Sequence, residues 1–174
     1  MLLNLHSYYS LRFGTLSLQD LISGMLSGGY DTAVLTDINN SSGSLDFIKL
    51  GRAAGLNLLA GMEFRHDDQL CFVAIAKNEK GFREINDYRT KLNMENRAVP
   101  ERAPEFEQVF VIYPLSKLNA FPLKDYEYIG IRPIERTRVQ LMDRKVLDRC
   151  VILAPVSFRK ADYTLHRQLR AIDN

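Results

Sequence analysis

Short apolar runs alternate with amphipathic helical patterns along most of this 174-residue chain, and this alternation constrains the fold more than any other feature. The apolar runs predict strands at residues 32–35, 56–60, 70–76, 108–112, 128–131 and 150–154, in addition to one at the amino terminus. Strands that alternate with helices are typical of a parallel sheet covered by helices, so the expected fold class is α/β. Seven strands fit either a closed or nearly closed βα barrel or a doubly wound sheet, and we favour the barrel.

The helical patterns have recognisable ends. Ser17 with Asp20 makes a plausible start for a helix of about ten residues, and the Gly28-Gly29 pair makes a plausible stop. A second helix should end at Gly55, and further helices are expected over 79–92, 135–141 and 162–172. We therefore expect two complete βα units within the first third of the chain.

Composition indicates an ordinary globular protein, with 46% hydrophobic and 25% charged residues, and we expect one domain over 1–174. The formal net charge of +2 is too small for bulk attraction to nucleic acid or to a membrane. Cys71 and Cys150 each lie in an apolar run, which argues against a disulfide framework and favours a reducing, cytoplasmic location. No apolar segment approaches 18 residues, so we expect no membrane span.

Two motifs suggest a known family. Residues 4–10 read N-L-H-S-Y-Y-S, and residues 35–40 read L-T-D-I-N-N. Further matching stretches are A-G-L at 54–56, G-M-E-F at 61–64, I-A-K-N-E-K-G-F at 75–82 and H-R-Q-L-R-A-I at 166–172. Together they resemble the PHP (polymerase and histidinol phosphatase) family, and within it the domain that opens the alpha subunit of bacterial DNA polymerase III. The resemblance implies a distorted seven-stranded βα barrel.

The resemblance also implies a metal site from which most ligands are missing. Active members of the family hold divalent metals with His, Asp and Glu side chains on the loops that follow the strands, and such metals activate water. The corresponding positions here are Asn4, His6, Phe13, Ile38, Glu63, Cys71, Pro155 and Val156. Only His6 and Glu63 keep a ligand's chemistry, so we expect no metal cofactor and no catalytic residue. The alternative is a depleted site that still binds Mn, Zn or Fe.

Other residues receive structural interpretations. We expect His6 to be a hydrogen-bonded relic, Glu63 to form an ion pair with a nearby arginine, and Asp37 to brace the turn at 39–44. His66 and His166 look exposed and incidental.

Four arginines form a separate group of candidates. Each lies a few residues past the end of a predicted strand, where parallel strands open onto one face, so they are candidates for an anion-binding ring or else are ordinary solvated charges. They are Arg12, Arg65, Arg132 and Arg159.

The functional hypothesis is therefore a degenerate, metal-free PHP domain, the N-terminal part of a longer DNA polymerase III alpha subunit. The resemblance implies that the parent chain would synthesise DNA with Mg²⁺ held by another domain. The expected partners are the other domains of that subunit, a proofreading exonuclease subunit and, through the parent chain, DNA. The alternatives are a free-standing metal-dependent phosphoesterase or 3′-5′ exonuclease with a depleted site, and a small anion-binding module.

Overall fold

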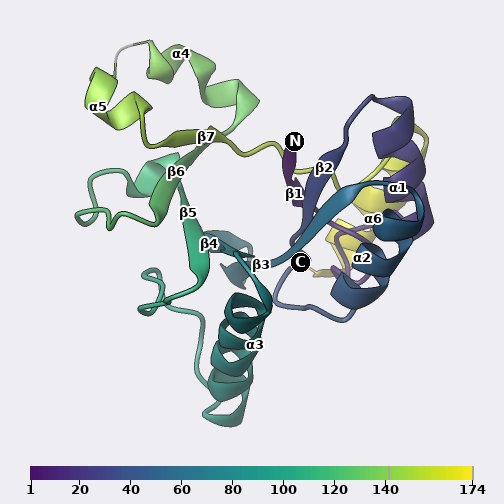
Figure 1. The fold of residues 1–174 in the computed structure, drawn as a ribbon, viewed down its shortest axis with the longest axis horizontal. Helices are drawn as coiled ribbons and strands as arrows, with labels where there is room; N and C mark the ends of the chain where they lie inside the picture. The colour runs from purple at the N-terminus through teal and green to yellow at the C-terminus, as the bar shows by residue number, and fades with distance from the viewer. Residues whose placement is uncertain (141, 174) are drawn as a thin grey trace. The chain divides into compact units, whose positions relative to one another are not determined.

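A computed structural model describes residues 1–140 and 142–173, and within them hydrogen bonds connect seven strands (Figure 1). The strands are β1 (Leu2–Leu5), β2 (Thr32–Leu35), β3 (Asn57–His66), β4 (Gln69–Ala76), β5 (Val109–Pro114), β6 (Glu127–Ile131) and β7 (Cys150–Ile152). The helices are α1 (Leu18–Ser27), α2 (Ser44–Ala53), α3 (Glu79–Met94), α4 (Arg136–Val139), α5 (Arg144–Leu147) and α6 (Tyr163–Asp173). Leu141, the predicted end of a helix from Glu135, lies outside the described residues.

The strands are hydrogen-bonded in the order of the sequence, from β1 to β7. Four neighbouring pairs are parallel, β1 with β2, β2 with β3, β5 with β6 and β6 with β7, which confirms the predicted α/β class. The prediction of a wholly parallel sheet is wrong for β4, which pairs antiparallel with β5. The reason is local. Asp67 and Asp68 form a two-residue turn between β3 and β4, and a turn this short reverses the direction of the chain, so β4 runs opposite to the strand before it.

The chain divides into two compact units, Met1–Met62 with Pro155–Asn174, and Glu63–Ala154. In the first unit, α1 and α2 pack on each other over the core. The predicted start of α1 is confirmed, because Ser17 Oγ accepts a hydrogen bond from the Asp20 backbone N–H at 3.0 Å and Asp20 closes the capping box. The predicted stop is confirmed as well: α1 ends at Ser27, and Gly29 follows in the left-handed region with a φ of 70°.

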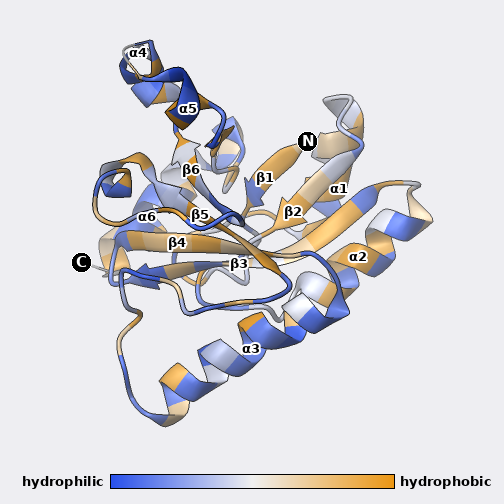
Figure 2. Ribbon diagram, turned by 60° about the vertical axis from the view of Figure 1, so that its left-hand side comes forward, coloured by the Kyte–Doolittle hydropathy of each residue, from blue (hydrophilic) through white to orange (hydrophobic). Residues whose placement is uncertain are grey.

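In the second unit, α3 lies along β4 and β5. Asn78 caps α3 through its side-chain oxygen, which accepts from the Gly81 N–H at 3.0 Å. Figure 2 shows β4 largely in the hydrophobic colour, whereas α3 is mainly hydrophilic with few apolar positions. The buried face of α3 includes Ile85 and Leu92. Among the described residues, no helix is long and apolar enough to span a bilayer.

Candidate functional site

His6 directly follows β1 and is completely buried. Its Nδ1 is 2.9 Å from the hydroxyl oxygen of Ser157. The segment that supplies Ser157 runs beside β1, because Val156 forms a parallel bridge with Leu5 and its carbonyl accepts from the His6 N–H at 2.9 Å. The structure therefore brings the predicted positions at the start of the chain together with those at Pro155 and Val156.

Asn4 and Phe13, two of the degenerate ligand positions, have structural contacts. Asn4 is 2% exposed, and its Oδ1 accepts a hydrogen bond from Thr36 Oγ1 at 2.6 Å. The Phe13 ring meets the His6 ring edge to face, with centroids 5.3 Å apart. Phe13 also meets His166 of α6 in the same manner at 5.4 Å. An amide oxygen and an aromatic ring therefore stand where the resemblance places two metal ligands.

Two more residues complete this cluster, which we call the aromatic clamp: His6, Phe13, Phe158 and His166. Phe158 stacks on the His166 ring with centroids 4.2 Å apart. His166 Nδ1 lies 2.8 Å from the carbonyl oxygen of Phe13, so this nitrogen donates. His166 is half-buried, and the expectation that it is exposed and incidental is wrong. Its only sequence signal was the likeness of residues 166–172 to the polymerase branch, which carries no information on contacts.

Asp37 is a hub of hydrogen bonds and is 1% exposed. Its Oδ1 accepts from the Ser7 N–H at 2.7 Å and from Ser10 Oγ at 2.6 Å, and its Oδ2 accepts from Ser7 Oγ at 2.7 Å. Ser10 Oγ in turn accepts from the N–H of Ile38 at 3.0 Å. These bonds hold the loop between β1 and α1, whereas we expected Asp37 to brace the turn at 39–44.

The remaining predicted ligand positions lie in the second unit. Glu63 is buried in β3 and forms an ion pair with Arg65, two residues along the same strand. Cys71 is buried in β4, and burial raises the pKa of its thiol, so the protonated form, which is a poor metal ligand, is favoured. His66 is exposed, as expected, and lies 3.8 Å from the Asp67 carboxylate.

The donor set fits a metal poorly. Among the side chains that the structure describes, no three from His, Cys, Asp or Glu form a group that could hold an ion. The surviving donors already have protein partners, since His6 contacts Ser157 and Glu63 contacts Arg65. A divalent ion needs four or more donors that point into one space. These contacts of His6 and Glu63 would have to open before either side chain could bind a metal ion.

The four candidate arginines are divided between the units, and carboxylates pair with Arg65, Arg132 and Arg159. Arg132 Nη2 lies 2.9 Å from Glu135 Oε1, and this partner raises the pKa of the guanidinium. Arg159 reaches Asp20 at 2.9 Å and Asp162 at 3.1 Å. Arg65 lies within β3, not past the end of a strand as predicted, because β3 continues to His66. Arg12 is exposed in the loop after β1.

Comparison with known proteins identifies the class. The PHP domain family model matches residues 3–113, and the chain belongs to this family. The predicted PHP-type α/β fold with seven strands is thereby confirmed.

Three relatives are large polymerases. DNA polymerase III subunit alpha of Ureaplasma parvum serovar 3 is 39% identical over 83 residues, which are 48% of this chain and 8% of that protein. The error-prone DNA polymerase of Symbiobacterium thermophilum is 31% identical over 123 residues, 67% of this chain and 11% of that protein. DNA polymerase III subunit alpha of Treponema pallidum is 32% identical over 107 residues, 53% of this chain and 9% of that protein. The chain thus spans about a tenth of the length of these relatives, and it resembles the PHP domain of polymerase III alpha subunits.

Proposed function

We propose that this chain is a metal-free PHP domain that serves a DNA polymerase III alpha subunit as a structural and docking element. The observation that carries the proposal is the aromatic clamp, in which Phe13, at a position where a metal ligand was expected, packs between His6 and His166. The similarity to polymerase alpha subunits supports the polymerase context. Under this proposal the partners are the other domains of the subunit and a proofreading exonuclease, and the DNA is bound by the parent chain.

Physical chemistry supports the absence of hydrolysis. A metal-dependent phosphoesterase requires an ion to lower the pKa of a bound water and to neutralise phosphate oxygens. The His6 and Glu63 side chains offer at most three donor atoms between them, and both have protein partners. The chain's own residues are therefore arranged to hold one another and not an ion.

The proposal is tested by metal loading and by an assay for hydrolysis. After dialysis against Mn²⁺ or Zn²⁺ and gel filtration, elemental analysis should find well under one ion per chain. The same sample should hydrolyse neither p-nitrophenyl phosphate nor the 3′ end of single-stranded DNA above the rate of a His6→Ala variant. Two or more tightly held ions, or hydrolysis that His6→Ala abolishes, would overturn the proposal in favour of a phosphoesterase or exonuclease with a depleted site.

Anion binding stays a prediction for the four candidate arginines, Arg12, Arg65, Arg132 and Arg159. Their ion pairs with carboxylates are an argument against this prediction. A phosphate would have to compete with Glu63, Glu135, Asp20 and Asp162 for these guanidinium groups. Sulfate titration followed by NMR should show shifts at these arginines only if the pairs open. Shifts of equal size at Lys80 would mean that the anion finds no specific site.

A further inference from the structure

Three aromatic side chains and two cations form a strip within the second unit, which we call the cation–aromatic strip. Its members are Lys77, Phe110, Tyr126, Tyr128 and Arg149. The three rings and Arg149 lie at the amino ends of β5, β6 and β7. Lys77 directly follows β4 and reaches the same end because β4 runs antiparallel to β5. The strip is therefore separate from Arg132, which follows the opposite end of β6.

Rings and cations alternate along the strip. Lys77 Nζ lies 4.5 Å from the centroid of the Phe110 ring and 5.8 Å from that of Tyr126. The Phe110 and Tyr128 rings meet edge to face with centroids 6.0 Å apart, and Arg149 Cζ lies 5.9 Å from the Tyr128 centroid. Phe110 is 39% exposed, and both tyrosines are half-buried. Accessible rings beside cations offer a ligand both a stacking surface and positive charge.

The connection from β6 to β7 adds positive charge next to the strip. Residues 132–149 contain six lysines and arginines and three acidic residues, a net charge of +3, whereas the whole chain carries only +2. Helices α4 and α5 of this connection bury no residue, and Figure 1 shows both helices beyond β7. Arg144 and Lys145 of α5 are exposed, and α5 ends two residues before Arg149. The net positive charge of the chain is thus concentrated beside the strip.

Three of these cations are available to an anion. Lys77, Arg144 and Lys145 form no ion pair in the part of the chain that the structure describes. Arg149 Nη2 lies 3.2 Å from Oδ1 of Asp125, whose side chain is fully exposed. Surface contacts of this kind are weak, and so is the contact of Lys77 with the Phe110 ring. The Lys77 ammonium can therefore turn from the ring to a phosphate.

We propose that the cation–aromatic strip binds single-stranded nucleic acid. Bases stack on Phe110 and Tyr128, because every base has a flat face, and phosphates contact Lys77 and the cations of α5. Duplex DNA is a poorer occupant, because its bases already stack on one another. An acidic protein segment would use the cations but not the rings. The proposal depends neither on the metal content of the domain nor on its place in a polymerase.

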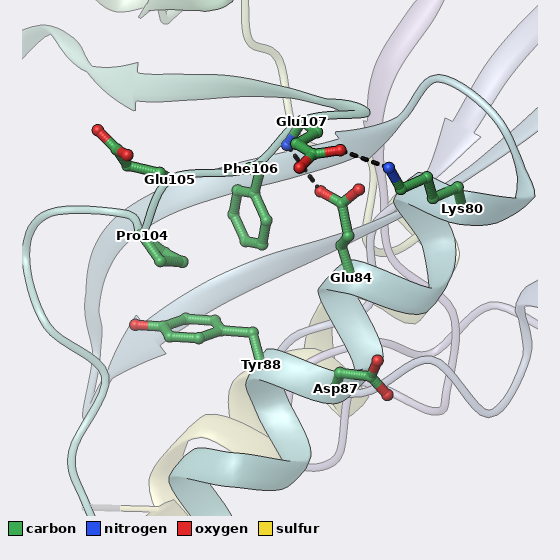
Figure 3. Close-up of a pocket in the computed structure, with 8 residues that line it drawn as sticks. All are labelled: Lys80, Glu84, Asp87, Tyr88, Pro104, Glu105, Phe106 and Glu107. Carbon is green, nitrogen blue, oxygen red and sulfur yellow. Dashed lines mark hydrogen bonds and ion pairs between the residues drawn. The ribbon is translucent and has the colours of Figure 1, made fainter.

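A hollow of about 360 Å³ beside α3 offers no second place for such a ligand (Figure 3). Its charged lining consists of Lys80, Glu84, Asp87, Glu105 and Glu107. The lysine already pairs with Glu107. Four carboxylates against one paired lysine would repel a phosphate backbone.

The test uses the 174-residue chain and a fluorescein-labelled oligomer of twelve thymidines, followed by fluorescence anisotropy. The matched control is an oligomer of twelve abasic deoxyribose phosphates, which keeps the backbone charge and lacks the bases. We expect the thymidine oligomer to bind at least ten-fold more tightly, because only its bases can stack. Raising NaCl from 50 to 200 mM should weaken its binding about 20-fold, the loss expected for three phosphate contacts.

A first variant removes the stacking surface. Phe110→Leu with Tyr128→Leu keeps apolar bulk but deletes both rings. It should lower the affinity for the thymidine oligomer at least ten-fold, to that of the abasic oligomer, and leave binding of the abasic oligomer unchanged. The comparison of the two oligomers on the natural chain stands even if this variant folds poorly.

A second pair of variants tests the cations. Lys77→Gln with Arg144→Gln should weaken binding of both oligomers at least five-fold. The control, Arg52→Gln with Arg83→Gln, removes the same charge from exposed arginines that form no ion pair among the described residues, and it should change neither affinity.

Several results would overturn the proposal. Equal binding of the two oligomers would mean that no base stacks, and equal losses in the two charge variants would mean that the attraction is general. Tighter binding of a duplex than of the thymidine oligomer would show that free bases are not recognised. Displacement by polyglutamate at the same concentration of charge would show that the strip accepts any polyanion, acidic protein segments included.

Discussion

At the scale of single residues, Asp37 shows how much can depend on one carboxylate. It is almost inaccessible and accepts three hydrogen bonds from Ser7 and Ser10. Asp37→Ala would leave buried donors without an acceptor, and each such loss costs about 1–3 kcal/mol. We expect the free energy of unfolding to fall by about 3 kcal/mol in urea titrations monitored by circular dichroism. Asp31→Ala, which changes an exposed aspartate, should stay within about 0.5 kcal/mol of the natural protein. An Asp37→Ala value that small would contradict the hydrogen-bond network.

Sequence reasoning identified Asp37 but not its partners. The motif at 35–40 identifies Asp37 as a candidate, and the tendency of aspartate to hydrogen-bond nearby backbone groups predicts that it braces the turn at 39–44. The actual donors, Ser7 and Ser10, precede it by about thirty residues in a loop without hydrophobic periodicity. Contacts of this kind are set by the packing of β1 beside β2, which brings the two loops together. A single sequence contains no local signal for them.

At the scale of elements, the aromatic clamp should determine how firmly α6 is held. α6 contributes His166, which lies between Phe13 and Phe158. Aromatic pairs contribute about 0.5–1.5 kcal/mol beyond the burial of their surface. Phe13→Ala should therefore make the α6 amides exchange with deuterium at least ten-fold faster, while exchange in α3 stays unchanged. Leu45→Ala, at an exposed position in α2, serves as the control. Unchanged α6 protection in Phe13→Ala would mean that other contacts hold the helix.

The same substitution by alanine should change the stability in opposite directions at two helical glycines, Gly81 and Gly24. A Cβ on Gly81, in the first turn of α3, would lie 1.8 Å from the Gln108 carbonyl oxygen, so α3 would have to move away from the segment that precedes β5. A Cβ on Gly24, in α1, meets nothing within 4 Å. Gly81→Ala should destabilise by about 2 kcal/mol or more. Gly24→Ala should stabilise by about 0.5–1 kcal/mol because alanine favours the helix. Thermal melts of both variants check the pair, and the same sign for both would contradict the backbone contact.

The elements themselves were largely predictable. The capping box of α1, its glycine stop and the apolar strands all have local signals. The direction of β4 was missed because a buried strand has the same apolar pattern in parallel and antiparallel pairs. The Asp67-Asp68 turn is the local sign of this reversal, but the apolar run at 56–60 ends well before it, whereas β3 extends to His66.

At the scale of the whole molecule, the clamp joins distant parts of the chain. The family model covers residues 3–113, which include His6 and Phe13, whereas Ser157, Phe158 and His166 lie beyond it. The motifs could predict which ligands are missing, because each position is read from its neighbours in sequence. They could not predict which side chains contact His6 and Phe13, because Ser157 and His166 come from the other end of the chain.

This arrangement leads to the last prediction, the restoration of a metal site. Asn4→His, Phe13→Asp and Ile38→His together add three donors within the first unit, to which His6 also belongs. The triple variant should bind Mn²⁺ in isothermal titration, whereas each single variant should not, since a single added donor leaves the coordination incomplete. Without metal it should be less stable than the natural chain, because it loses the Asn4–Thr36 hydrogen bond and the Phe13 ring.

Manganese at about 100 times its Kd should return about 2.7 kcal/mol of that stability to the triple variant and none to the natural chain. The decisive control adds His6→Ala to the triple variant, which removes the native donor and should abolish binding. If the triple variant binds no metal, the side chains at positions 4, 13 and 38 do not converge, and the alignment of these positions with the family's ligands is wrong. If binding survives His6→Ala, the ion occupies some other site, and the aromatic clamp does not occupy the position of the family's metal site.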